Sequence, residues 1–148
     1  MTAKRIAFAV KASILIAAGD RVIVPPFWRH EMLNALLVGE RRKRLTSDLT
    51  QSYLNDLDRL PIDVDLPASS TVFTATQALC RKHRLTAYDA AYLEIAIRER
   101  KVLATVDEEL RRAALAERRA GHLITYSIGC KLLKNRGRAG VWSELWKS

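Results

Sequence analysis

The pattern of apolar and polar positions predicts short strands that alternate with amphipathic helices. Apolar runs bounded by turn residues predict strands over 21–24, 62–65, 101–106 and 123–126. Between them, apolar positions recur every three or four residues and predict helices. The predicted helices cover residues 27–39, 47–60, 69–83, 86–100 and 107–121. This order predicts an α/β domain with a mostly parallel sheet and helices on both faces.

Each predicted helix has an apolar face that we expect to be buried. Ser69 or Ser70 is the expected cap of the third helix, and Pro61 ends the second. The residues expected to face inward on the first three helices are Met32, Leu33, Leu36, Leu37, Leu49, Tyr53, Leu54, Leu57, Val72, Phe73, Ala75, Ala78 and Leu79.

Residues 4–18 fit two interpretations. Ile6, Val10 and Ile14 recur at helical spacing, whereas residues 6–10 also fit a short buried strand. The charge of Lys11 and the lack of a convincing cleavage site argue against a secretion signal. No apolar run reaches the roughly 20 residues of a membrane span, so we expect no membrane association.

The charge of the chain favours an anionic partner. Its 148 residues carry a formal net charge of +9, with a sequence pI of about 10.0, so nucleic acid is the first candidate. We divide the chain into a domain over 1–126 and a basic C-terminal tail over 127–148. The tail fits a solubilising role and an RNA-binding role equally well. Basic clusters at 41–44 and 81–84 are typical of solvated faces.

The cysteines indicate a reducing compartment. Cys80 and Cys130 do not have the spacing of metal ligands, and we interpret them as free thiols. A cytoplasmic location follows from this interpretation.

Three acidic residues are predicted to lie at the ends of core elements. Glu31 follows the strand over 21–24, and Asp107 follows the strand over 101–106. Asp89 lies three residues after Thr86, an arrangement that predicts an acidic capping box at a helix start. In a parallel sheet, ligands bind beyond the carboxyl ends of the strands, where these acids can converge. Clustered carboxylates need a neutralising cation, and Mg²⁺ or Mn²⁺ suits oxygen ligands.

Each acid also has a purely structural interpretation. In this alternative, Asp89 is no more than the capping partner of Thr86, Asp107 is no more than a helix cap, and Glu31 is a solvent-facing helix residue. No glycine-rich phosphate loop is present, which disfavours a nucleotide triphosphatase. The histidines lie in polar or turn contexts, and we expect a surface position for each: His30, His83 and His122.

Three motifs together resemble the PIN-domain family, and within it the VapC-like toxins of bacterial toxin–antitoxin pairs. They cover residues 24–37, 85–93 and 103–110. The resemblance implies a three-layer α/β/α fold with a mostly parallel sheet. It also implies a Mg²⁺-dependent (or Mn²⁺-dependent) endoribonuclease that is inhibited by a small antitoxin protein and often forms a homodimer.

The resemblance assigns roles residue by residue. Glu31, Asp89 and Asp107 match the positions of metal-binding and catalytic acids. Thr105 matches a polar residue that supports the site, and Asn34 is a further supporting candidate beside Glu31.

The chain departs from the family pattern at its start. The family begins with a strand that ends in an aspartate, whereas Lys11 stands at that place here, or the first strand is absent. The domain over 1–126 is therefore interpreted as N-terminally incomplete. Two alternatives follow: a catalytically impaired or truncated PIN domain that only binds RNA or an antitoxin, and a wrongly recorded start.

Overall fold

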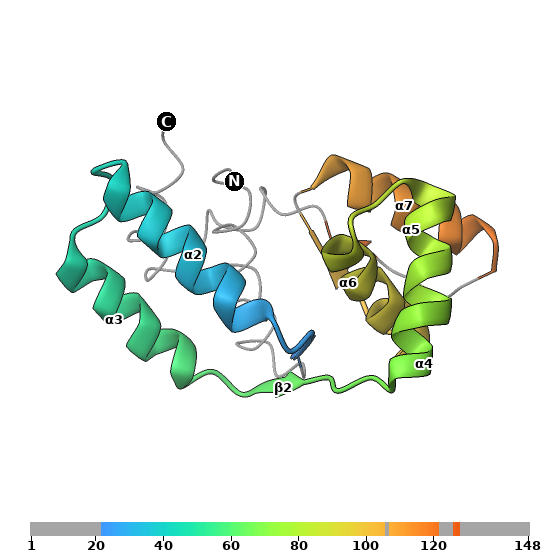
Figure 1. Cartoon of the computed structure of the whole chain (residues 1–148), viewed down its shortest axis with the longest axis horizontal. Coiled ribbons are helices and arrows are strands. Elements are labelled where there is room, and N and C mark those ends of the chain that lie inside the picture. Colours follow the sequence, from blue (N-terminus) through green and yellow to red (C-terminus); the bar gives the residue numbers. More distant parts are fainter. Residues whose placement is uncertain (1–21, 106, 122–125, 128–148) are drawn as a thin grey trace. The chain divides into compact units, whose positions relative to one another are not determined.

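The computed structural model describes residues 22–105, 107–121 and 126–127, which form a mixed α/β structure that is mostly helical (Figure 1). The predictions made for residues 4–18, Lys11, His122 and Cys130, and for the tail beyond Ser127, lie outside this part. Two compact units are present: unit 1 contains Phe27–Ile62, and unit 2 contains Ile23–Pro26 and the described part of Asp63–Ile128.

The observed elements follow the predicted order. Strands over 21–24 and 62–65 and all five predicted helices are confirmed, with ends that shift by a few residues. The elements are β1 (Val22–Val24), α2 (Trp28–Arg41), α3 (Ser47–Asp58), β2 (Ile62–Val64), α4 (Ser69–Thr71), the π-helical turn η1 (Val72–Thr76), α5 (Gln77–His83), α6 (Ala87–Arg98), β3 (Leu103–Ala104), α7 (Glu108–Arg119) and β4 (Tyr126–Ser127).

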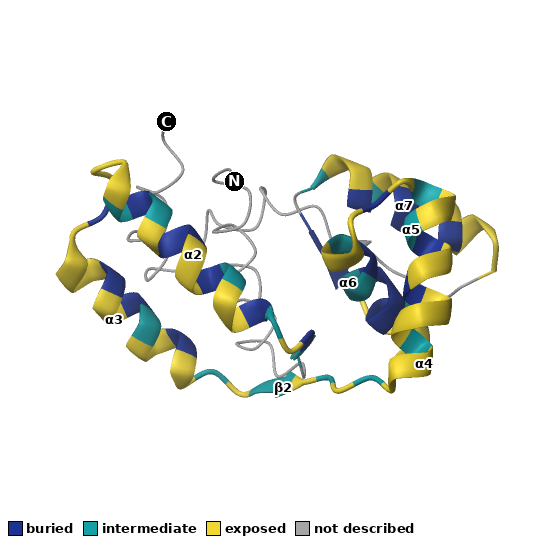
Figure 2. Ribbon diagram, in the orientation of Figure 1, coloured by how far each residue is buried: buried dark blue, intermediate teal, exposed yellow. Residues whose placement is uncertain are grey.

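Unit 1 is built on the packing of α2 against α3, and each helix has one buried and one exposed side (Figure 2). The hydroxyl of Thr46 caps α3 by accepting a hydrogen bond from the N–H of Leu49. Three predicted inward residues are wrong, because Leu33, Leu37 and Leu49 are exposed. The buried stripe is narrower than the apolar pattern, and it contains Trp28, Met32, Ala35, Leu36, Leu45, Thr50, Tyr53 and Leu57.

The described strands form two separate pairs. β1 pairs with β2, and the N–H of Asp65 donates to the carbonyl of Val24 at 2.8 Å. β3 pairs with β4 in parallel, with Leu103 opposite Tyr126. Within the described residues, β3 covers Leu103–Ala104 and is shorter than the predicted strand over 101–106. A short parallel sheet is present, and the three-layer PIN-like arrangement stays a prediction.

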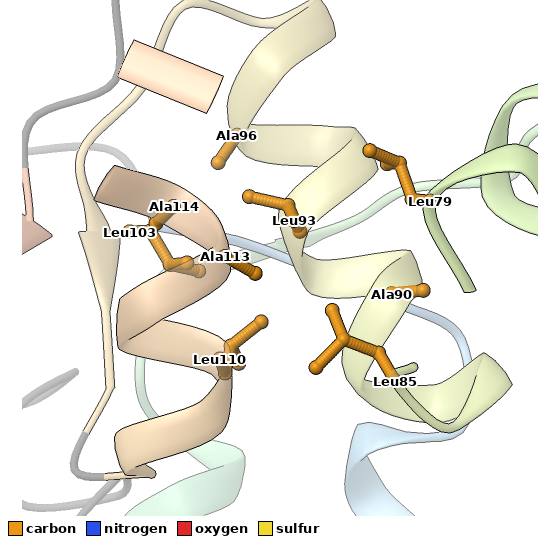
Figure 3. Packing of buried hydrophobic residues seen from close by; sticks show 9 residues of the cluster. All are labelled: Leu79, Leu85, Ala90, Leu93, Ala96, Leu103, Leu110, Ala113 and Ala114. Atoms are coloured by element: carbon orange, nitrogen blue, oxygen red, sulfur yellow. The ribbon is translucent and has the colours of Figure 1, made fainter. Parts of the chain in front are cut away.

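The core of unit 2 surrounds α6. Leu93 and Ala90 on α6 are fully buried, and they pack between α5 and α7 (Figure 3). The alanines allow the helices to approach closely, while the leucines fill the space between them. The cluster consists of Leu79, Leu85, Ala90, Leu93, Ala96, Leu103, Leu110, Ala113 and Ala114.

The helical segment from α4 to α5 corrects two predictions. Its N-cap is Ala68 instead of Ser69 or Ser70, and the methyl group of Ala68 cannot accept a capping hydrogen bond. The predicted apolar face is confirmed only at Leu79, because Phe73 is 71% exposed and Val72, Ala75 and Ala78 are exposed too. Burial instead follows the stripe that meets α6, which includes the polar residues Thr76 and His83 along with Leu79 and Cys80. Spacing on the helix, rather than apolarity alone, decides which residues are covered.

Candidate functional site

Thr86 holds the first candidate acid at the start of α6. Its hydroxyl oxygen accepts a hydrogen bond from the N–H of Asp89 at 3.1 Å, and its O–H donates to Asp89 Oδ2 at 2.7 Å. The predicted capping box is therefore present, with the reciprocal bond made by the hydroxyl instead of the backbone of Thr86. Asp89 is half-buried, and Oδ1 has no partner in the described part of the chain. One carboxylate oxygen is fixed while the other is available.

Asp107 holds a matching position at the start of α7. Its Oδ1 accepts from the N–H groups of Glu109 and Leu110, at 2.9 and 3.0 Å. Oδ2 has no partner among the described residues. Thr105 is buried, and its hydroxyl accepts from the N–H of Asp107 at 3.0 Å. This contact fixes the backbone that carries the acid, and the supporting role of Thr105 in a metal site stays a prediction.

Asp89 and Asp107 lie at the starts of two helices that share the unit 2 core. Leu85, just before the cap of α6, and Leu110, in the first turn of α7, belong to one hydrophobic cluster (Figure 3). Helix N-termini carry partial positive charge, which stabilises the carboxylates of Asp89 and Asp107.

The structure does not bring all predicted site residues together. Glu31 is half-buried and Asn34 is exposed on α2, which belongs to unit 1, so their part in a shared site stays a prediction. Within the described ranges, no group of three or more His, Cys, Asp or Glu side chains is arranged to hold a metal ion. Unit 2 thus supplies two carboxylates, each at a helix start.

Sequence reasoning missed a buried ion-pair cluster that joins the end of α5 to the last turn of α7. Glu117 on α7 is only 2% exposed, and its Oε1 contacts Lys82 Nζ at 2.8 Å and His83 Nε2 at 2.5 Å. The expected surface position of His83 is therefore wrong, because its side chain is only 11% exposed. Burial alone would raise the pKa of Glu117, but the bonds from Lys82 and His83 outweigh burial and hold the pKa below its ordinary value.

The sequence did contain a signal for Glu117. The buried positions of α7 recur at helical spacing, and Glu117 falls on that stripe after Leu110, Ala113 and Ala114. A charged residue on a buried stripe needs a partner of opposite charge. The basic cluster over 81–84 supplies that partner from α5.

A second ionic cluster fastens α6 to the segment after β2. Arg98 donates to Glu94 at 2.9 Å and to Asp65 at 2.8 Å, and it also pairs with Glu99. These bonds, led by the one to Glu94, raise the pKa of Arg98, so the guanidinium stays charged. Because Glu94 is buried, the pairing satisfies a carboxylate that would otherwise lack water.

Comparison with known proteins assigns no family to the chain. No protein-family model matches it, and no curated protein matches it significantly. The resemblance to PIN domains therefore rests on the three motifs alone. In the part of the chain that the structure describes, no helix has the length and apolarity needed to cross a membrane.

Proposed function

We propose that this chain is a Mg²⁺-dependent endoribonuclease of the VapC-like toxin type. The observation that carries the proposal is that Asp89 and Asp107 each lie at the start of a helix, and that these two helices share the unit 2 core. The motif resemblance and the basic charge of the chain support it. In this proposal the protein acts in the cytoplasm, its partners are RNA and a small antitoxin, and it associates as a homodimer.

The donor set of the two aspartates fits Mg²⁺. This ion prefers oxygen ligands, and proteins usually bind it through one or two carboxylates together with water and substrate phosphates. Asp89 and Asp107 each have an oxygen without a protein partner in the described residues. In the proposal these two residues hold the ion, and Glu31 is the third acid.

The protein's own groups position these carboxylates for phosphodiester hydrolysis. Thr86 fixes one oxygen of Asp89, and Thr105 fixes the backbone at Asp107. When bound, the ion supplies a water of lowered pKa and positive charge beside the scissile phosphate.

RNA cleavage by the purified full chain tests this function. We expect cleavage of a structured RNA in Mg²⁺ or Mn²⁺ and no cleavage after the ions are removed with EDTA, because the carboxylates have no other means of activating water. Restoring Mn²⁺ should restore cleavage. Cleavage that persists in EDTA, or none in either ion, would contradict the proposal.

The role of Glu31 is tested separately on α2. Glu31→Gln should lower the metal-dependent cleavage rate at least about tenfold, because a neutral amide is a weaker ligand for a hard cation. Glu40→Gln is the matched control, since Glu40 lies on the same helix and should leave the rate unchanged. Equal rates for the two variants would remove Glu31 from the site.

A catalytically impaired domain that only binds RNA or an antitoxin is the second candidate. The feature that favours it is the missing first acid, because either Lys11 stands in its place or the first strand of the family is absent. A lysine there competes with a cation for the carboxylates. Calorimetric titration with Mn²⁺ separates the two candidates, because binding that Asp89→Asn abolishes supports the nuclease and no binding supports the impaired domain.

A further inference from the structure

Three basic residues occupy backbone conformations that usually require glycine. Lys43, Arg84 and Arg100 have φ angles of 56°, 55° and 51°, and no other described non-glycine residue has a positive φ. Each follows the end of a helix, α2, α5 and α6 respectively. At each end the next N–H bonds back to a carbonyl five residues earlier, as in a Schellman motif. Glycine fits this position without steric strain, so each of these three side chains is held there at a cost in backbone energy.

Arg84 differs from the other two in its surroundings. It follows the basic last turn of α5, in which Lys82 and His83 bind the buried Glu117 of α7. These contacts bring the ends of α5 and α7 together. Because Glu117 pairs with Lys82 and His83, its charge is satisfied by those two residues.

Three arginines remain exposed at this junction: Arg81, Arg84 and Arg118, which together we name the Arg84 surface. Arg118 directly follows Glu117 on α7. In the described part of the chain, none of the three takes part in an ion pair. Arg84 also lies two residues before Thr86, so the Arg84 surface borders the start of α6, which carries Asp89.

We propose that the Arg84 surface binds the phosphate backbone of single-stranded RNA and guides it to Asp89 at the start of α6. The choice of RNA as the ligand rests on the proposed function. Guanidinium groups recognise phosphate oxygens through paired N–H donors, and the unpaired positive charge attracts a polyanion. The left-handed backbone at Arg84 is retained, in this proposal, because the side chain contacts phosphate.

The test compares two glycine substitutions that are matched in charge and backbone. Arg84→Gly and Arg100→Gly each remove one positive charge from a left-handed position, and the two positions flank opposite ends of α6. Affinity for a fluorescent 20-nucleotide single-stranded RNA is measured by anisotropy in EDTA. Because EDTA prevents any metal-dependent cleavage, this binding result stands apart from success or failure of the nuclease proposal.

We expect Arg84→Gly to weaken RNA binding about fivefold at low salt and to reduce the slope of log affinity against log salt by about 0.7, the value for one phosphate contact in a single strand. Arg100→Gly should stay within about twofold of the wild type. Both variants should fold, and their melting temperatures should be unchanged or slightly higher, because glycine relieves the backbone strain.

Two outcomes would overturn the proposal. One is equal RNA affinity for Arg84→Gly and Arg100→Gly, which would make Arg84 part of a general positive field. The other is that poly-glutamate displaces the labelled RNA at the same charge concentration as unlabelled RNA does. That result would assign the surface to acidic protein segments. Loss of affinity in Arg84→Gly alone, with weak competition by poly-glutamate, supports the Arg84 surface.

Discussion

Replacing Asp107 by asparagine is expected to reduce metal-dependent RNA cleavage at least about 100-fold while leaving the protein folded. In the proposed function this carboxylate has two separable roles, as a helix cap and as a metal ligand. As N-cap it accepts two backbone hydrogen bonds through Oδ1, and an asparagine oxygen makes the same bonds. Asparagine and aspartate are nearly equal as caps, so the free energy of unfolding should change by less than about 0.5 kcal/mol. Only the charge needed to hold a cation is lost.

Glu109→Gln is the matched control for this experiment. Glu109 lies in the same first turn of α7 and is exposed, so its neutralisation changes the local charge equally without touching Asp107 Oδ2. Initial cleavage rates in Mg²⁺ and urea unfolding curves are measured for both variants. If Asp107→Asn cleaves as fast as Glu109→Gln, Asp107 is only a helix cap.

Asp89→Asn provides an independent check at the second helix start. The hydroxyl of Thr86 donates to Asp89 Oδ2, and an amide oxygen accepts the same bond. We expect a loss of cleavage similar to that of Asp107→Asn, because both acids would serve one ion. The two losses should not multiply in the double variant, since removal of either ligand already disables the shared site.

Local signals in the sequence predicted much of the structure that positions the acids. The capping box at Thr86 and Asp89 was predictable, because a helix start needs side-chain acceptors for its first N–H groups. The acidic start of α7 followed from the same rule, and Asp107 caps it. Both helix starts were therefore predictable from local interactions, which depend on few distant residues.

The buried faces were predicted less well, because burial depends on which neighbour each helix meets. Phe73 is apolar and exposed, whereas His83 is polar and mostly covered. The covering of His83 depends on Glu117, 34 residues later in the chain, and no local pattern contains that contact. For the same reason, the sequence pattern alone does not decide whether Glu31 joins the two aspartates.

The Glu117 cluster leads to the second large expected effect, which concerns stability. Glu117→Gln should lower the free energy of unfolding by about 2 kcal/mol at pH 7, because it leaves Lys82 and His83 beside a neutral group in a buried place. The loss is less than for a fully enclosed pair, since the Lys82 side chain is 55% exposed and keeps part of its hydration. Urea unfolding at pH 7 measures it, and Glu109→Gln on the exposed side of α7 is the control.

The pH dependence of this difference tests its electrostatic origin. The folded protein holds the pKa of Glu117 below its ordinary value, whereas the unfolded chain has a carboxyl pKa of about 4.3. A lowered folded-state pKa contributes stability above the unfolded-state pKa, and this contribution disappears as the pH falls through the folded-state value. The advantage of the wild type over Glu117→Gln should therefore be present at pH 5 and above and shrink below about pH 4. A difference that stays the same at acidic pH would mean that Glu117 stabilises the protein through packing, and that its charge contributes nothing.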